Sequence, residues 1–363
     1  MPLSKIQNVG NQVIPNSGRR NLIINGAMQV AQTGTSATGI GIAVGYNTVD
    51  RWRFADANNP TGRFTETQST DAPEGFGYSR KFEVTTNDGS PSDNEMQYTD
   101  QFIEAQNLQL LKYGTSNAES FTLSFYVKSS VASTMGVRIT HEDGGGSYGA
   151  SYTINATNTW ERKTITVPGN TATAINNDTG RGLRIAFGLT VGADNAGSNS
   201  TAWGNGSLFG AHTNTFVGTA NATWQVTGVQ LEIGSSASDF EHLSFAEELA
   251  LCQRYLYVQG GTGNYERFAV GYAQSSSEAR CVTFFPVQMR TFPDCTLSGG
   301  QLLVAMRTQG YVVTGITVDF NSPTVGHVKY EVDNNIAGLI MDDPCHISAN
   351  NNTDVRLIWS AEL

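Results

Sequence analysis

A polar loop in the middle of the chain carries the side chains best suited to bind a ligand. Residues 195–221 are almost wholly Gly, Ser, Thr, Ala and Asn, yet they include Trp203, Phe209 and His212. A pyranose ring has an apolar face and a rim of hydroxyls, so proteins hold it with an aromatic platform and short polar side chains. We therefore predict a glycan site in this loop, with Trp203 as the stacking residue and Asn205 or His212 as hydrogen-bonding partners.

Two tyrosines form a weaker second candidate. Tyr148 and Tyr152 lie next to the glycine turn at residues 144–146. The alternative for all these aromatic residues is structural, because a ring in a long loop often closes the edge of a β-sandwich or packs on a neighbouring subunit. If that holds for Trp203, we expect the ligand contact to lie in residues 257–363 instead.

Catalysis has little support in the sequence. Glycoside hydrolysis needs two carboxylates about 5 to 10 Å apart around a cleft. The candidate pairs, Glu142 with Asp143 and Asp342 with Asp343, lie beside a glycine turn or before a proline, where acids are mostly solvated turn residues. A nucleophile elbow between a strand and a helix and a phosphate-binding loop are both missing. The sequence therefore predicts no catalytic residue and no enzyme.

Metal and cofactor sites are equally poorly supported. The four cysteines, at positions 252, 281, 295 and 345, form no Cys-x-x-Cys pair, and we interpret them as buried apolar residues rather than disulfides or zinc ligands. Asn25, Asp50 and Glu232 could offer oxygen atoms to calcium, but a hard cation favours more carboxylates. We predict no metal and no cofactor.

Composition and charge limit the partners. The chain has 363 residues, a formal net charge of −10 and 22 Lys and Arg without a basic cluster, which argues against nucleic acid. It has neither a secretory signal nor an apolar run of the roughly 20 residues that span a bilayer, so we expect a soluble protein without membrane insertion. The 39 glycines and only 15% charged residues are typical of an all-β protein.

The positions of the strands predict the domain organisation. Short runs with alternating apolar residues, such as residues 121–127, recur between turn residues over residues 21–243, which predicts a β-sandwich or jelly roll. Ser244 and Glu247 form a capping box that begins a connector helix over residues 244–256. Strand patterns resume over residues 257–363, where we predict a second, smaller β-sandwich that is a candidate receptor-contact domain.

Residues 1–20 contain too few apolar side chains to fold alone, and we interpret them as an arm that is attached to another protein or exchanged between subunits. Such an arm favours a homotrimer in which apolar surface is shared. The tryptophans within or next to strand patterns, Trp52, Trp160, Trp224 and Trp359, are expected in the core.

Several sequence blocks, taken in order, resemble the tail-fibre and virion-surface structural proteins of tailed bacteriophages, with a jelly roll like that of carbohydrate-binding modules. The blocks are residues 21–28 (NLIINGAM), 49–52 (VDRW), 121–130 (FTLSFYVKSS), 158–166 (NTWERKTIT), 223–234 (TWQVTGVQLEIG), 240–242 (FEH) and 246–255 (AEELALCQRY). The resemblance covers about residues 19–257 and is looser beyond them.

The resemblance implies a trimeric fibre or spike on the virion surface, folded in the host cytoplasm and released by lysis. It implies contact with other virion proteins through the arm and with a glycan or receptor of the host cell. It brings no catalytic residues. Two alternatives remain open: a tailspike that depolymerises surface polysaccharide, and a head decoration or head fibre protein.

Overall fold

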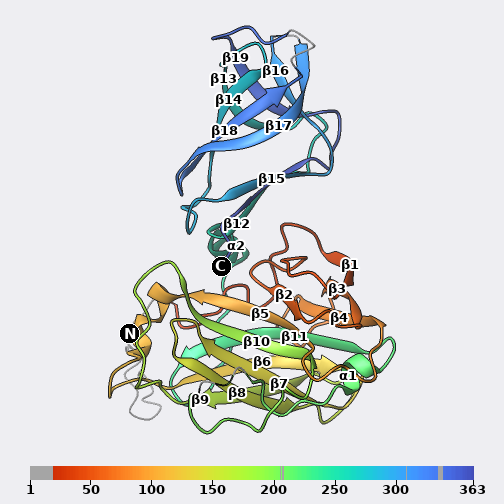
Figure 1. Cartoon of the computed structure of the whole chain (residues 1–363), viewed down its shortest axis with the longest axis vertical. Helices are drawn as coiled ribbons and strands as arrows, with labels where there is room; N and C mark the ends of the chain where they lie inside the picture. The colour runs from red at the N-terminus through yellow and green to blue at the C-terminus, as the bar shows by residue number, and fades with distance from the viewer. Residues whose placement is uncertain (1–18, 205, 207, 308, 334–337) are drawn as a thin grey trace, which may run out of the picture.

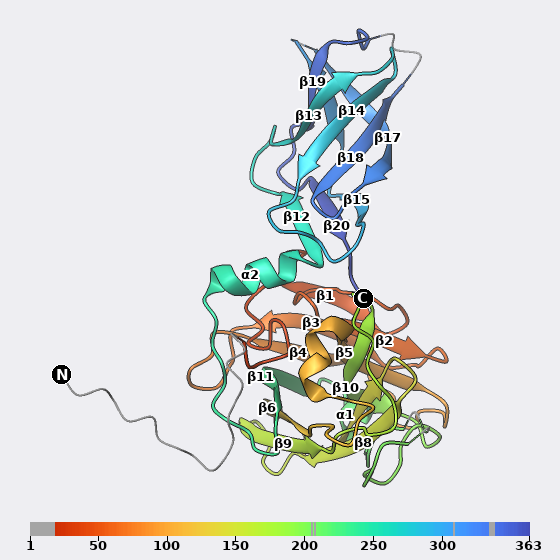
Figure 2. The same ribbon diagram turned by 90° about the vertical axis from the view of Figure 1, so that its left-hand side faces the viewer.

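The computed structural model describes residues 19–204, 206, 208–307, 309–333 and 338–363. Most of the arm predicted over residues 1–20 lies outside the described residues. Within them the fold is all-β, as predicted, with strands from Ser36 to Ile233 in two sheets and strands from Leu256 to Ser360 in a barrel and a small third sheet. The two groups of strands follow one another along the long axis of the molecule (Figures 1 and 2).

The first group of strands is a sandwich of two antiparallel sheets. One sheet has the order β1 (Ser36–Ile40), β3 (Arg63–Ser69), β4 (Ser79–Thr86), β11 (Thr223–Ile233), β6 (Phe121–Ser129), β9 (Glu161–Val167). The other has the order β2 (Arg53–Ala57), β5 (Met96–Glu104), β10 (Arg181–Val191), β7 (Thr134–His141), β8 (Gly146–Thr153). From β4 to β11 the chain crosses repeatedly from one sheet to the other, as the jelly-roll prediction requires.

Alternating side chains build the sandwich core. In β6 the apolar residues Phe121, Leu123, Phe125 and Val127 are fully buried, because every second side chain of a strand points to the same face. They meet rings from the other sheet, and the Phe125 and Phe187 ring centroids lie 5.0 Å apart. These contacts make the sandwich a rigid support for its loops.

The second group of strands contains a closed barrel and a three-stranded sheet. The barrel order is β13 (Arg267–Ala273), β14 (Glu278–Phe284), β18 (Val325–Val332), β17 (Gln309–Asn321), β16 (Leu302–Met306), β19 (Pro344–Ala349). The small sheet has the order β12 (Leu256–Gly260), β20 (Arg356–Ser360), β15 (Asp294–Ser298). The second, smaller β-sandwich expected after the helix is present as a β-rich region, but most of its strands form one sheet that closes into a barrel.

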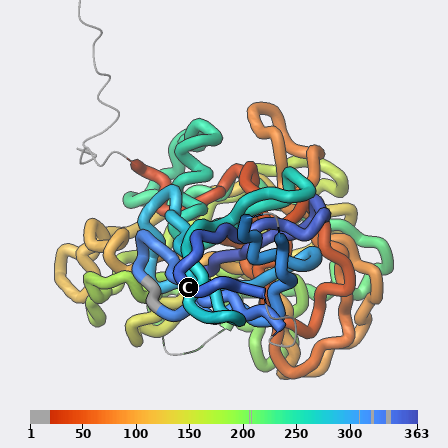
Figure 3. The backbone as a smooth tube through the Cα atoms, turned by 90° about the horizontal axis from the view of Figure 1, so that it is seen from above, coloured from red at the N-terminus to blue at the C-terminus, as the bar shows by residue number. Residues whose placement is uncertain are grey.

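A packed joint connects the sandwich to the barrel. The helix α2 (Phe245–Gln253) begins with the predicted capping box of Ser244 and Glu247. Cys252, Tyr255 and Leu363 share one buried apolar cluster with Phe102 of the sandwich. Figure 3, seen along the long axis, shows the blue barrel strands lying over the sandwich rather than beside it.

Smaller helical elements and the end of α2 differ from prediction. The structure adds a 3-10 helix η1 (Ala105–Leu111) and a short helix α1 (Thr215–Gly218), which the sequence analysis did not predict. The helix predicted over residues 244–256 ends at Gln253, and Leu256 already belongs to β12. Among the described residues, none of the helices has the length and hydropathy needed to span a membrane.

Candidate functional site

The polar loop over residues 195–221 folds back onto the sandwich. Its described residues pair with strand β8 through the backbone, with Ser147 and Gly204 forming a bridge and Ser200 donating to the carbonyl of Gly149. Gly149 has no room for a side chain, because an added Cβ would lie 2.9 Å from the carbonyl oxygen of Leu208. The loop is therefore held against the sheet instead of projecting from its edge.

Trp203 is half-buried and packs against the sandwich core. Its ring centroid lies 5.8 Å from that of Tyr113, 6.3 Å from His141 and 6.2 Å from Tyr148. Its indole Nε1 donates a hydrogen bond of 2.7 Å to the carbonyl of Pro168. These contacts give Trp203 and the half-buried Tyr148 a packing role, which is the structural alternative stated for the loop aromatics.

The structure contradicts the predicted ligand-binding role of Phe209 and Tyr152, because both rings are buried and no ligand can reach them. Phe209 is 0% exposed and lies between Tyr98 and the guanidinium of Arg138, 4.7 Å from its ring centroid. Tyr152 is buried on the inward face of β8, where its hydroxyl accepts a 2.9 Å hydrogen bond from Nε1 of Trp224.

The remaining polar candidates of the loop do not complete a site. The Nδ1 atom of His212 accepts a 3.0 Å hydrogen bond from the backbone N–H of Gly136, and burial lowers the pKa of this histidine to about 4. His212 is therefore neutral and positions the loop. Asn205 lies outside the described residues.

Three of the four tryptophans expected in the core are fully buried, namely Trp52, Trp224 and Trp359. The core position predicted for Trp160 is wrong. Its side chain is half-exposed, and the ammonium of Lys128 lies 5.3 Å from its ring centroid. In β9 the odd-numbered residues, such as Ile165, face the core, so the preceding even-numbered Trp160 faces outward.

The candidate acids are engaged in structural contacts. Glu142 forms an ion pair of 3.0 Å with Arg184, and Asp143 accepts hydrogen bonds from Asn176. Asp343 pairs with Arg307 at 2.7 Å. Within the described ranges, His, Cys, Asp and Glu side chains form no group of three or more that could hold a metal ion.

The cysteines lie mostly in the interior. Cys252, Cys281 and Cys345 are buried, as predicted, and Cys295 is half-buried. The Sγ atoms of Cys281 and Cys345 lie 3.9 Å apart inside the barrel. Their hydrogen bond and burial raise the pKa of Cys281, so its thiol is protonated and is a poor nucleophile.

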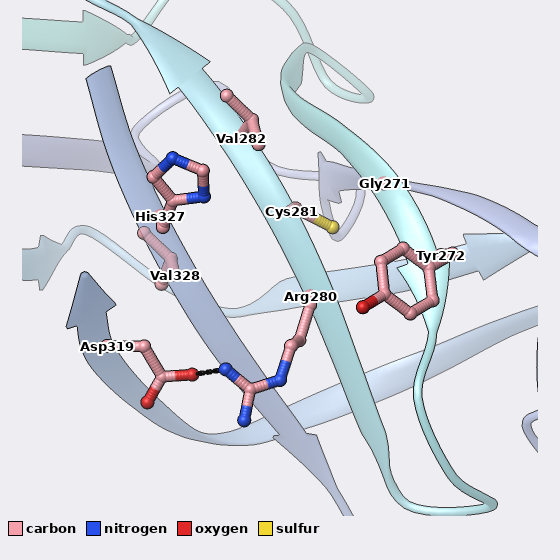
Figure 4. A pocket seen from close by; sticks show the side chains of 8 residues that line it. All are labelled: Gly271, Tyr272, Arg280, Cys281, Val282, Asp319, His327 and Val328. Carbon is pink, nitrogen blue, oxygen red and sulfur yellow. Dashed lines mark hydrogen bonds and ion pairs between the residues drawn. The ribbon is translucent and has the colours of Figure 1, made fainter. Parts of the chain in front are cut away.

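A pocket on the outer wall of the barrel combines an exposed aromatic ring with fixed polar groups. The barrel pocket has a volume of about 390 Å³ and is lined by Gly271, Tyr272, Arg280, Cys281, Val282, Asp319, His327 and Val328 (Figure 4). These residues come from β13, β14, β17 and β18, and strand pairing alone brings them together. Tyr272 lies opposite Arg280, and Val282 lies opposite His327.

The geometry of the barrel pocket suits a ligand with both apolar and polar faces. The Tyr272 side chain is 47% exposed and stands on the wall next to Arg280. The guanidinium of Arg280 is fixed by an ion pair with Asp319 and by a hydrogen bond to Gln274. The exposed imidazole of His327 adds a further polar group on the neighbouring strand (Figure 4). An aromatic surface thus stands beside oriented donors and acceptors.

The barrel pocket was not predicted from the sequence, although it lies in a region where strands were expected. Both β13 and β14 lie within residues 257–363, where strand patterns were expected, and alternation alone puts Tyr272, Arg280 and Val282 on outward faces. Their proximity depends on the register between β13 and β14, for which a single strand gives no signal.

Comparisons with known proteins add a likeness of fold. No protein-family model matches the chain, and no curated protein matches it. Among solved structures, one similar chain is the enzymatically active domain of tailspike protein 4 of bacteriophage CBA120, with 15% identity and a TM-score of 0.32; the match covers 59% of this chain and only 21% of that chain.

Two carbohydrate-binding modules are also similar. The match to TmCBM61 in complex with β-1,4-galactotriose has 10% identity and a TM-score of 0.29, and covers 59% of this chain and 99% of that one. The match to the family 11 module of Clostridium thermocellum, in complex with a β-1,3-1,4-mixed-linked tetrasaccharide, has 12% identity, a TM-score of 0.25 and coverages of 58% and 99%. With TM-scores below 0.5, these likenesses carry no argument about function.

Proposed function

We propose that the chain is a non-enzymatic structural protein of a phage virion that contacts a glycan of the host surface through the barrel pocket. The observation that carries the proposal is the exposed Tyr272 ring beside the fixed pair of Arg280 and Asp319. A pyranose stacks on such a ring through its C–H face, while its hydroxyls reach the guanidinium and the carboxylate. The pocket lies on the barrel, at the end of the molecule away from the sandwich (Figure 1).

The virion part of the proposal is supported by the ordered sequence blocks of residues 19–257, which resemble phage fibre proteins. On this basis the protein is a homotrimer on the virion exterior, attached to other virion proteins through residues 1–20, folded in the host cytoplasm and released by lysis. Three copies of a weak site act together, because linked binding events raise avidity by about 10² to 10⁴ over one site.

The absence of hydrolytic activity belongs to the same proposal. The candidate acids Glu142 and Asp343 are tied to arginines, and Asp143 to an asparagine. In the barrel pocket, Asp319 is paired with Arg280 and is the only carboxylate among the lining residues, whereas glycoside hydrolysis uses two. If the protein were a depolymerase, the purified protein would release reducing ends from host polysaccharide. We expect no such release.

A binding assay on host envelope glycans tests the proposed site. We expect Tyr272→Ala to weaken binding by about tenfold per site, the equivalent of about 1.4 kcal/mol for a lost stacking contact. Tyr265→Ala is the matched control, because Tyr265 is 61% exposed but does not line the pocket. Equal binding by the two variants, both folded, would contradict the proposal. Separately, images of virions labelled on this protein would show whether it belongs to the tail or to the head.

A further inference from the structure

An apolar strip lies beside the polar groups of the barrel pocket. It consists of Val270, Val282 and Phe284, which point outward from β13 and β14. Val270 is 62% exposed, Phe284 is 71% exposed, and Val282 is half-buried between them. Val270 and Val282 are direct cross-strand partners, and the pair of Tyr272 and Arg280 lies two residues further along each strand, on the same face. Exposed apolar side chains in contact with one another and next to a pocket mark a binding surface.

The charges around the pocket do not favour an anionic ligand. Arg280 is neutralised by Asp319. Lys329, the neighbour of Arg280 on β18, pairs with Glu331 at 2.8 Å and with Glu278 at 3.8 Å. Two cationic side chains thus face three carboxylates, on a chain whose net charge is already −10. Among the described residues that line the pocket, a sugar acid would meet no unpaired Lys or Arg, and the negative net charge would repel it at long range.

We propose that the barrel pocket selects an uncharged sugar that carries a methyl group, either as an N-acetyl substituent or as a 6-deoxy carbon. The inference rests on the proposed function and specifies its ligand. The sugar ring stacks on Tyr272, its hydroxyls meet Arg280 and Asp319, and its methyl group lies over the valine pair of the apolar strip. Tyr272, Arg280 and the valine pair lie on the same outward face of two paired strands, and Asp319 reaches the pocket from β17 through its ion pair with Arg280.

The size of the expected preference follows from the methyl group. Moving one methyl group from water onto an apolar surface strengthens binding by about fourfold. A plain hexose leaves the valine pair in water, and a hydroxyl placed over it loses part of its hydration without gaining a partner. We therefore expect a preference of about fourfold or more per site for the methylated member of each matched pair of sugars.

The test uses the full chain and multivalent sugar conjugates of equal density. One arm compares N-acetylglucosamine with glucose, a second compares L-rhamnose with L-mannose, and a third compares glucuronic acid with glucose. Preference for the methylated sugar in the first or second arm identifies the acetamido or the 6-deoxy form, and weaker binding of glucuronic acid is expected in the third. A wild-type protein that binds methylated and plain sugars equally overturns the inference.

Single substitutions test whether the preference for methylated sugars depends on the apolar strip. Val282→Thr keeps the shape and β-branching of valine but places a hydroxyl where the methyl group should lie, so we expect the fourfold preference to fall towards one. Val312→Thr is the matched control, because Val312 is an exposed strand valine on β17 that does not line the pocket, and it should retain the preference. Equal melting temperatures of the two variants verify their folding.

Failure of this inference and failure of the proposed function give different results. If Tyr272→Ala removes sugar binding while the wild type does not distinguish methylated from plain sugars, the glycan site stands and its proposed specificity is wrong. If the preference survives Val282→Thr, the methyl group does not lie on the valine pair, and this inference is overturned. If the wild type binds none of the conjugates and no host glycan, both proposals fail.

Discussion

Replacing Trp203 by alanine should lower the stability of the sandwich and leave glycan binding intact. The indole packs against Tyr113, His141 and Tyr148, at centroid distances between 5.8 and 6.3 Å. Its Nε1 atom also donates to the carbonyl of Pro168, which ties the loop to the far end of β9. The substitution removes these contacts together, while the barrel pocket lies in a different part of the fold.

The magnitude follows from the degree of burial. A fully buried Trp→Ala substitution costs about 3–5 kcal/mol, part of it through the cavity that remains. Because Trp203 is half-buried, water can refill part of the space, and we expect a loss of about 2–3 kcal/mol, of which the hydrogen bond accounts for about 1 kcal/mol. In a cooperative unit of this size, that loss lowers the melting temperature by about 5–10 °C.

Calorimetry and adsorption to host cells, measured on the same preparations, test this expectation. Adsorption is measured at a temperature well below the lowered transition, where the Trp203→Ala protein is still folded. Tyr272→Ala should show the opposite behaviour, with an unchanged melting temperature and weakened adsorption. A Trp203→Ala protein that melts like the wild type but no longer adsorbs would refute this reasoning and restore the loop as the binding site.

Further expectations concern the stability of the sandwich and the joint. Glu66→Ala leaves the fully buried Arg80 without its 2.9 Å partner and should cost about 3–5 kcal/mol in urea unfolding, whereas Glu119→Ala, in an exposed pair, should cost less than about 0.5 kcal/mol. Burial raises the pKa of Asp50 from 3.8 to about 6, so its contribution to stability is fully present below pH 4 and is lost as the pH rises through 6; a pH series should show a decline of up to about 3 kcal/mol that Asp50→Asn flattens. Ser244→Ala should cost about 1 kcal/mol by removing the cap of α2, which a melting curve detects. An unchanged melting curve for Glu66→Ala, or the same pH slope in Asp50→Asn, would contradict these assignments.

Local sequence patterns predicted the strands and the main helix because those patterns have local causes. The alternation in residues 121–127 reflects the two faces of one strand, and Ser244 with Glu247 satisfies backbone donors of the same helix turn. Both interactions connect residues close in sequence. For the same reason the prediction of an all-β chain needed no knowledge of strand order.

The candidate site depended on contacts between distant residues, and there the predictions were less successful. Phe209 was expected on a projecting loop, but the loop pairs with β8 and places the ring against Tyr98, more than one hundred residues earlier. Tyr152 was expected near a turn, but its position in β8 directs it inward to Trp224. Neither outcome has a signal in the local sequence, since strand pairing and inward or outward orientation are set by the whole sheet.

The joint between sandwich and barrel gives the proposed binding mode its geometry. Arg254 at the end of α2 donates two hydrogen bonds of 2.7 and 3.0 Å to Glu104 of the sandwich, and Leu363 lies in the same buried cluster as Phe102. The guanidinium of Arg51 lies 3.5 Å from the ring centroid of Tyr255 and also pairs with Glu362. A joint packed in this way restricts swinging of the barrel, so each barrel pocket keeps a fixed direction relative to its sandwich. In the proposed trimer, three pockets would therefore meet a repeating surface glycan without first losing the orientational freedom that a flexible linker would carry, which lowers the entropic cost of the second and third contacts. A pocket that is weak alone, with one stacked ring and one methyl contact, can thus support firm adhesion.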